Sequence, residues 1–233
     1  MPNVFPDDAQ SLSQAPNGRR PERVTLRGRF VTLAPLDAAR DAPALYGATS
    51  GAQYDALWTY LFDGPYPDLA SFRESLAAKA ASLDPLFSAV LDNASGQTVG
   101  YLSLMRIDVA NRVVEVGNIL YSPLLQRTIG ATEAQYLLAR YVFDDLGYRR
   151  YEWKCNALNA PSRRAAKRFG FSFEGIFRQH MIVKGASRDT AWFAMLDSEW
   201  PARRAAFERW LAPQNFDAAG RQKISLLALR EVA

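Results

Sequence analysis

Three apolar, strand-like segments follow one another in the middle of the chain and limit how it can fold. They are LFSAVLD (86–92), TVGYLSLMRI (98–107) and VVEVGNILY (113–121), and only NASGQ and DVANR separate them. Connections this short join antiparallel neighbours, because a crossover between parallel strands needs about a dozen residues or more. The sequence therefore predicts two successive antiparallel hairpins.

The next segments predict a helix and a strand that runs parallel to the third strand. RYEWKC (150–155) alternates like a strand, and Gly147 before it suits the C-terminal end of a helix. The helix itself is indicated by an apolar stripe at helical spacing, formed by Ala134, Leu137, Leu138, Tyr141 and Val142. A strand–helix–strand unit makes its two strands parallel neighbours, so we expect one parallel pair in an otherwise antiparallel sheet.

The remaining segments complete a mixed α/β pattern. Asn159 and Gly170 suit the start and end of a second helix, and strands are expected at about 171–183 and 189–196. Ahead of the central strands, RVTLRGRFVTLAPL predicts a hairpin that turns at Gly28. We expect a mobile tail over 1–22, one domain over 23–211 and a C-terminal extension over 212–233, whose apolar residues dock on the domain or on a second subunit.

Composition excludes several classes of protein. The 233 residues include one cysteine and one histidine, which excludes a disulfide framework, a cysteine-rich zinc site and a Ser-His-Asp triad. The net charge of +4 is small and the charges are interspersed, which argues against a nucleic-acid-binding protein. No apolar run reaches membrane-spanning length, so we expect no membrane partner, no metal and a cytoplasmic location.

The segment QRTIGAT (126–132) opens the first helix and has the composition of an anion-binding turn. A helix N-terminus carries unpaired N–H groups and the positive end of the helix dipole, and small residues let a phosphate approach the backbone. No Gly-Lys-Ser/Thr follows, and the spacing of a dinucleotide fingerprint is missing. The alternative is an ordinary loop in which Gly130 and Ala131 are small for packing, and these residues alone do not decide between the two.

The order strand–LLQRTIGATEA–helix–strand–NAPSRRAAKRFGF resembles the coenzyme-binding core of the GNAT superfamily of N-acetyltransferases. It is most similar to the branch that contains the ribosomal-protein alanine N-acetyltransferases. The resemblance extends over about 23–211 and is densest over 115–173. It implies a GNAT-like fold with a mostly antiparallel sheet, a splayed parallel strand pair and helices on both faces. It also implies acetyl-CoA as co-substrate and a primary amine as acceptor.

The resemblance also implies which residues hold the coenzyme. The family's phosphate-binding turn falls on Gln126, Arg127, Thr128, Ile129, Gly130 and Ala131, followed by Thr132. Ile129 departs from the pattern, because the family usually has glycine there and this chain has its glycine one residue later. Asn159 matches the asparagine that supports the pantetheine arm, and Ser162 a position near the thioester sulfur or a phosphate. Arg163 and Arg168 reach a phosphate or form a solvated helix face.

The implied reaction is direct attack of an amine on a thioester, which needs a base, an oxyanion site and an acid. Glu115 is the candidate base, with a solvent-facing strand residue as the alternative. Backbone amides near Leu120 are expected to face the thioester carbonyl, with Gly117 at a bulge. Ser162 or Tyr121 is the candidate acid. Trp58 and Tyr60 are expected at the acceptor pocket, although a core cluster is the alternative for both.

Other readings remain open on the sequence alone. Cys155 is best explained as a small buried residue, and His180 as a strand residue without a catalytic role. The acceptor is a protein N-terminus or a small amine such as an amino acid, polyamine or antibiotic. A different class is a catalytically silent GNAT-fold module that binds CoA or a partner, and Ile129 is the feature that favours it. The sequence does not decide between a monomer and a homodimer.

Overall fold

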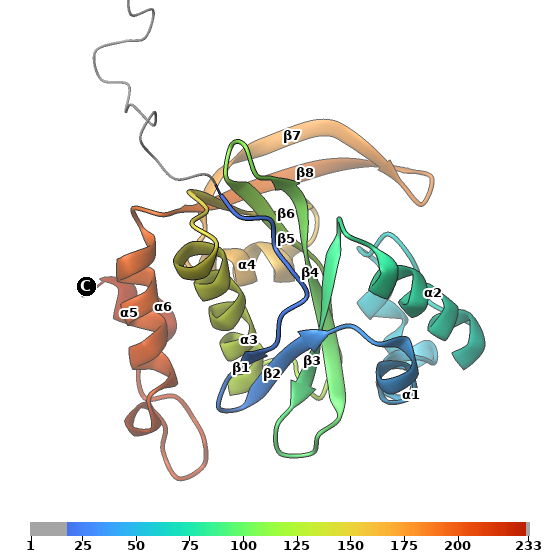
Figure 1. The fold of residues 1–233 in the computed structure, drawn as a ribbon, viewed down its shortest axis with the longest axis horizontal. Coiled ribbons are helices and arrows are strands. Elements are labelled where there is room, and N and C mark those ends of the chain that lie inside the picture. The colour runs from blue at the N-terminus through green and yellow to red at the C-terminus, as the bar shows by residue number, and fades with distance from the viewer. Residues whose placement is uncertain (1–17, 232–233) are drawn as a thin grey trace, which may run out of the picture.

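A computed structural model describes residues 18–231, and residues 1–17 of the predicted N-terminal tail lie outside the described part. An eight-stranded sheet runs through the molecule in the order β1-β2-β3-β4-β5-β6-β8-β7 (Figure 1). Its strands are β1 (Leu26–Arg27), β2 (Val31–Pro35), β3 (Leu86–Asp92), β4 (Thr98–Asp108), β5 (Val113–Tyr121), β6 (Arg150–Asn156), β7 (Ser172–Val183) and β8 (Ala186–Leu196).

The predicted pairing is confirmed along the sheet. Neighbouring strands are antiparallel, except that β5 and β6 are parallel. The last hairpin is tighter than the sequence suggested, because β7 and β8 are joined by Lys184 and Gly185 alone. Both residues have positive φ, 50° and 77°, which fits a two-residue hairpin turn.

Helices cover both faces of the sheet, as predicted (Figure 1). The helices α1 (Ala38–Thr49) and α2 (Leu69–Ala81) lie on one face, joined by a 3₁₀ turn (Ala52–Trp58) and the loop 59–68. The helices α3 (Ile129–Arg140), α4 (Ala160–Phe169), α5 (Trp200–Leu211) and α6 (Leu226–Glu231) lie on the other. Side chains begin several helices: Asp37, Asp68, Thr128 and Asn159 each accept a hydrogen bond from a first-turn amide.

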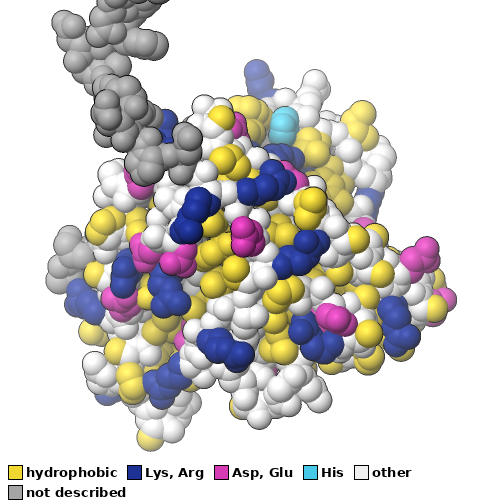
Figure 2. Space-filling model, viewed as in Figure 1, with side chains coloured by type: hydrophobic (Ala, Val, Ile, Leu, Met, Phe, Trp, Pro, Cys, Tyr) yellow, Lys and Arg dark blue, Asp and Glu magenta, His cyan; other side chains and the backbone are white. Residues whose placement is uncertain are grey.

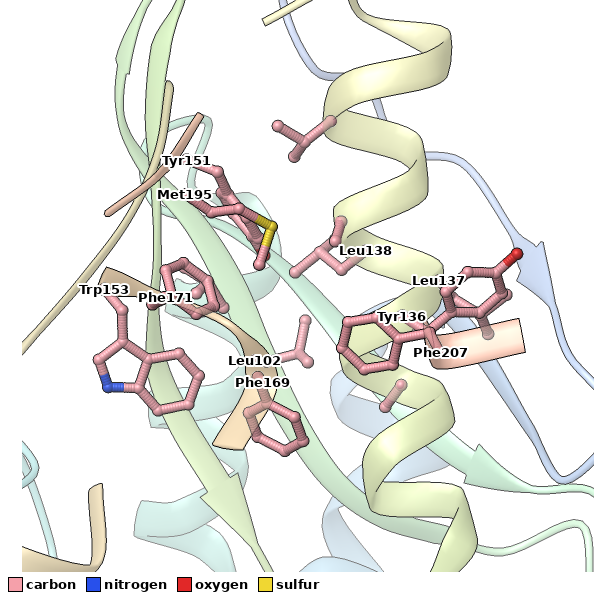
Figure 3. Close-up of a cluster of buried hydrophobic side chains, with 14 of the residues drawn as sticks. Leu102, Tyr136, Leu137, Leu138, Tyr151, Trp153, Phe169, Phe171, Met195 and Phe207 are labelled. Atoms are coloured by element: carbon pink, nitrogen blue, oxygen red, sulfur yellow. The ribbon is translucent and has the colours of Figure 1, made fainter. Parts of the chain in front are cut away.

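The main core forms where α3 packs between the sheet and α5 (Figure 3). The predicted apolar stripe of α3 is buried throughout, and its last residues belong to a π-helical turn (Tyr141–Asp145) that continues the helix. Aromatic rings from β6 and α5 contact Tyr136 and Phe143, which flank the stripe. Residues 130–139 of α3 are all buried, so packing on every side fixes the helix between the sheet and α5. A second core lies between the sheet and α1 and α2.

The parallel pair separates after a short stretch, and this creates the opening for a site. β5 and β6 are paired only over Val113–Val116 and Arg150–Trp153. Beyond that point β5 bulges: Leu120 faces Tyr101 but Gly117 faces Ser103, and Asn118 has a φ of 50°. A bulge bends a strand and breaks its ladder. The ends of β5 and β6 therefore diverge toward the N-termini of α3 and α4.

The C-terminal extension docks on the body of the protein, which was one of the two predicted outcomes. Leu226 and Leu229 of α6 are buried against α5 and α4.

Basic and acidic side chains are interspersed over the face shown in Figure 2. Within residues 18–231, no helix has both the length and the apolar character needed to cross a membrane.

Candidate active site

A cavity of about 1170 Å³ opens where β5 and β6 diverge. Its walls come from β5, β6, the first turns of α3 and α4, the segment 56–62 and the C-terminal segment 216–222. Of the residues predicted for the site, the cavity is lined by Tyr60, Glu115, Leu120, Gln126, Arg127, Thr128, Ile129, Ala131, Thr132, Asn159 and Ser162. The predicted residues Trp58 and Gly130 do not line it.

The first turn of α3 shows how the chain manages without the family's glycine. Arg127 has a φ of 64°, so the left-handed residue comes two positions before Ile129. Thr128 is the extended N-cap, and Ile129 is the first helical residue. The Thr128 hydroxyl donates to the Leu125 carbonyl and accepts from the Ala131 amide. Its proton is therefore already used within the protein. The first helical amides, of Ile129 and Gly130, have no intrahelical acceptor.

Gly130 is small because of packing. A Cβ built on it would lie 2.8 Å from Cγ1 of Val31, on β2. Packing against β2 therefore explains why residue 130 has no side chain. Its backbone amide still belongs to the open first turn of α3.

The first turn of α4, which follows β6 in the chain, faces the same cavity. The Asn159 side chain caps the helix by accepting from the Ser162 amide at 3.1 Å. The Ser162 hydroxyl accepts from Nε1 of Trp153 at 3.0 Å. Cys155 is buried, as predicted, and burial raises the pKa of its thiol while a hydrogen bond from Ser162 opposes this.

Arg168 and Arg163 have different surroundings. Arg168 lines the cavity and donates to the Thr132 hydroxyl at 3.0 Å, which connects α4 to the first turn of α3. Its guanidinium lies 5.0 Å from the ring of Trp210, and burial lowers its pKa. Arg163 instead donates to the Ala157 carbonyl and lies outside the cavity lining. The solvated-face alternative therefore fails for Arg168.

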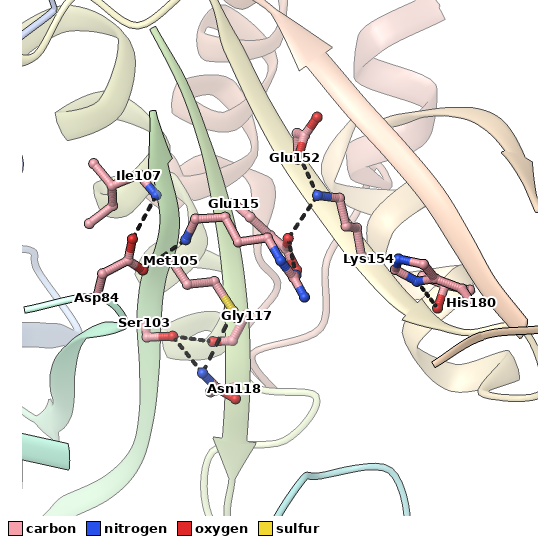
Figure 4. Close-up of polar contacts among 12 residues, drawn as sticks. Asp84, Ser103, Met105, Ile107, Glu115, Gly117, Asn118, Glu152, Lys154 and His180 are labelled. Atoms are coloured by element: carbon pink, nitrogen blue, oxygen red, sulfur yellow. Dashed lines mark hydrogen bonds and ion pairs between the residues drawn. The ribbon is translucent and has the colours of Figure 1, made fainter. Parts of the chain in front are cut away.

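Among the residues that the structure describes, Glu115 is the only acidic one that lines the cavity. It is 3% exposed, so the solvent-facing alternative is wrong. Its carboxylate lies 2.6 Å from the Arg106 guanidinium and 3.1 Å from Nζ of Lys154 (Figure 4). Lys154 also pairs with Glu152 at 2.7 Å and lies 3.8 Å from the Trp192 ring. Glu115 is thus part of a buried charge network.

The segment 56–62 forms one wall of the cavity, but Trp58 is not part of that wall. Trp58 is 2% exposed, donates to the Thr49 carbonyl and packs against Tyr66 and Phe72, so the prediction of a substrate contact is wrong. Its position at the end of a 3₁₀ turn directs it into the second core. Tyr60 does line the cavity, and its hydroxyl lies 3.3 Å from the Leu158 carbonyl, on the α4 side.

Several lining residues were missed from the sequence. Among them, Lys154 and Arg188 are strand residues with no distinguishing motif. Others belong to the C-terminal end of the chain: Trp210, Phe216 and the segment 220–222. Trp210 donates from Nε1 to Gln222 at 2.7 Å and meets the Phe216 ring edge-on. Only the docking of the extension brings these residues to the cavity. No cluster of metal-binding side chains occurs in the described part of the chain.

A sheet whose parallel pair opens between two helix N-termini, beside a large cavity, is an arrangement that can hold a ligand with phosphate groups. Residues 31–172 match the acetyltransferase (GNAT) domain, and the chain belongs to the GNAT acetyltransferase family. The family resemblance seen in the sequence is therefore confirmed.

Known proteins agree with this assignment. A GCN5-related N-acetyltransferase from Brucella melitensis has a similar structure, with a TM-score of 0.91 and 53% identity over 94% of this chain and 99% of that one. The protein named "Putative ribosomal N-acetyltransferase YdaF" of Bacillus subtilis is 26% identical over 78% of this chain and 96% of its own length. Spermidine N-acetyltransferase from Vibrio cholerae, solved with CoA and spermine, shares the fold at a TM-score of 0.59 and 19% identity, over 74% of this chain and 98% of that one.

Proposed function

We propose that the protein transfers the acetyl group of acetyl-CoA to a primary amine, with a protein N-terminus as the acceptor. The observation that carries the proposal is the cavity at the divergence of β5 and β6, onto which the first turns of α3 and α4 both open. A helix N-terminus suits a phosphate, and the cavity exceeds the usual range for one small ligand. The name of the Bacillus relative supports a protein acceptor.

The donor side of the cavity fits a coenzyme with a diphosphate. The amides of Ile129 and Gly130 are available at the first turn of α3, beside the Arg127 side chain. Arg164, Arg168 and Arg221 add positive charge along the same wall. Asn159 is expected to support the pantetheine arm, since its amide NH₂ remains free while its oxygen caps α4. The thioester that the donor supplies is an activated acyl group.

The residues of the acceptor side supply the proton transfers. Glu115 is proposed to take a proton from the acceptor's ammonium group, directly or through water, so that the neutral amine attacks the thioester carbonyl. The backbone amide of Leu120, beside the bulge, is proposed to stabilise the charge on the carbonyl oxygen. Ser162 is proposed to protonate the departing sulfur. Tyr121 is the alternative acid: burial keeps its pKa raised although Gln135 donates to it, so the phenol stays protonated.

Thiol release tests the proposal directly. The purified chain is mixed with acetyl-CoA and a set of amines that includes N-terminal peptides, polyamines and amino acids, and free CoA is followed with a chromogenic disulfide. We expect release that depends on the amine, with mass spectrometry showing a gain of one acetyl group on it. Tight binding of CoA without turnover on any amine would instead identify a silent binding module.

A further inference from the structure

The cavity is strongly basic, and the basic residues occupy two separate regions. Seven basic side chains line it against one acidic side chain, Glu115: Arg106, Arg127, Lys154, Arg164, Arg168, Arg188 and Arg221. Four of them belong to the α3 turn, α4 and the C-terminal segment, where the coenzyme phosphates are proposed to bind. The other three, Arg106, Lys154 and Arg188, lie on the strands β4, β6 and β8.

Two of the three strand cations are neutralised within the protein. Arg106 pairs with Glu115, and Lys154 pairs with both Glu115 and Glu152. Arg188 differs, because no described residue forms an ion pair or hydrogen bond with it. It is 7% exposed, and its Nε is sealed from solvent without an acceptor. A buried cation without an ion-pair or hydrogen-bond partner is costly, and this makes Arg188 unusual among the cations that line the cavity.

Arg188 is directed toward the acceptor side of the cavity. Its guanidinium lies 5.6 Å from the centre of the Phe62 ring, in the segment that follows Tyr60. This segment is held by the β7–β8 hairpin, since Nζ of Lys184 donates to the carbonyls of Trp58, Asp63 and Gly64. The position of Arg188 relative to the segment 58–64 is therefore fixed by the fold.

The imidazole of His180 interacts electrostatically with the same cations. His180 lies on β7, packed against Phe177 and Trp192, with Nδ1 3.0 Å from the Thr190 hydroxyl. Loss of hydration and the charges of Arg106, Arg188 and Lys154 lower its pKa, and Glu115 opposes this. The ion pairs give the same sign, because the three strand cations outnumber the two carboxylates beside them, Glu115 and Glu152.

We propose that Arg188 binds a carboxylate that the amine acceptor carries close to its reacting nitrogen. This inference rests on the proposed acetyltransferase function and names the acceptor class. A guanidinium binds a carboxylate through two parallel hydrogen bonds, and its terminal Nη groups can supply both donors. The carboxylate belongs to an amino acid with a free α-carboxyl group, or to an Asp or Glu side chain next to a peptide N-terminus.

The selectivity should be large, because an acceptor without the carboxylate leaves the Arg188 charge buried and unpaired. Two matched acceptor pairs distinguish the sources of the carboxylate. The first pair is a free amino acid and its amide, and the second is a C-terminally amidated Ala-Asp peptide and its Ala-Asn counterpart. We expect kcat/KM for thiol release to favour the carboxylate by about 100-fold in one pair. The pair that responds identifies the source.

Arg188→Gln should abolish this preference while the neutral acceptor keeps a kcat/KM within a few-fold of the parent protein. Arg178→Gln, at an exposed β7 position outside the cavity lining, is the matched control and should change neither value. Circular dichroism establishes that both variants are folded. Calorimetric titration with CoA should give the same affinity for Arg188→Gln and for the parent. A loss of CoA affinity with an unchanged acceptor preference would assign Arg188 to the coenzyme and overturn the proposal.

The single histidine gives a readout that does not depend on turnover. In proton NMR, His180 should titrate below the ordinary value of 6.5. Arg188→Gln should raise its pKa, and so should saturation with N-acetyl-aspartate, whereas N-acetyl-asparagine amide, which has no carboxylate, should leave it unchanged. Thiol release that is equal for acids and amides, with no response of His180, would remove the carboxylate site but leave the acetyltransferase proposal intact. Absence of thiol release with every amine would remove the acetyltransferase proposal itself.

Discussion

Glu115 Oε2 lies 3.1 Å from Nζ of Lys154 and so connects β5 to β6 near the end of their paired stretch, which closes at Val116 and Trp153. The ion pair joins two walls of the cavity, and among the described residues Glu115 is the one carboxylate that lines it. A structural role and the proposed catalytic role therefore coincide at Glu115, and a test has to separate them.

Glu115→Gln should lower kcat about 100-fold and change its pH profile, because the proposed base is removed. It should also lower the free energy of unfolding by about 3 kcal/mol, since Arg106 and Lys154 lose a buried partner. Glu152→Gln is the matched control, because it takes a carboxylate from Lys154 but does not line the cavity. Equal losses of kcat in both variants, measured beside urea denaturation, would leave Glu115 with a structural role alone.

Ile129→Pro should weaken CoA binding about tenfold or more while the protein remains folded. Proline suits the first helical position, and the extended Thr128 before it is compatible with proline. The change removes one amide donor, and a hydrogen bond to a charged group is worth about 1.5–3 kcal/mol. Calorimetric titration measures the affinity. Ile129→Ala keeps the amide and serves as control, and equal affinity in the two variants would place the phosphates elsewhere.

Ser162→Ala should lower kcat more than it lowers CoA affinity, if the hydroxyl protonates the departing sulfur. It also leaves Nε1 of Trp153 without its acceptor, which should cost about 1–3 kcal/mol of stability. Trp153→Phe is the control for stability, because it removes the same hydrogen bond and keeps the serine. Steady-state kinetics on Tyr121→Phe complete the comparison: a larger loss of kcat there would transfer the role of acid to the phenol.

Trp58→Phe and Tyr60→Phe should affect different properties. Trp58→Phe removes volume and a hydrogen bond from a core, and we expect a loss of about 2 kcal/mol in stability with an unchanged KM for the acceptor. Tyr60→Phe should leave stability nearly unchanged, because its hydroxyl is exposed, and should alter the acceptor KM. Thermal unfolding and initial rates provide the two measurements, and a KM that responds only to Trp58→Phe contradicts this division.

The loop beside Tyr60 should lose stability in acid. Burial alone would raise the pKa of Asp63, but hydrogen bonds from Lys79 and Tyr66 outweigh it, and the pKa is lowered below 3.8. A lowered carboxyl pKa gives stability that is present above the unfolded value and is lost as the pH falls through the folded value. Lys79→Met should therefore cost about 1 kcal/mol at neutral pH and flatten the dependence of stability below about pH 4. Urea denaturation at pH 3 and pH 7 checks both effects.

Much of the fold was predictable because it depends on local rules. Five-residue turns require antiparallel pairing, and a helix between two strands makes those strands parallel. The start of α4 followed from Asn159, whose side chain caps the first turn of the helix. The family resemblance placed the ligand at the first turns of α3 and α4. The cavity does open at both turns.

The remaining errors concern side chains whose direction depends on distant elements. Nothing local to Trp58 shows that α1 and α2 close over it. The residues of the C-terminal segment reach the cavity only because α6 docks on α4 and α5. Such packing joins elements that are separate in the chain, so no short segment of sequence specifies it.

The amino-acid sequence by itself determined the order of strands and helices, the parallel pair and the helix N-terminus at the site, because periodicity, turn length and capping act over a few residues. Only the tertiary structure decided the charges of the site. The register of β5 against β6 places Glu115 beside Lys154, and the packing of β8 leaves Arg188 buried without an acceptor. Electrostatic interactions depend on distance and burial in space, and both are set when the whole sheet assembles.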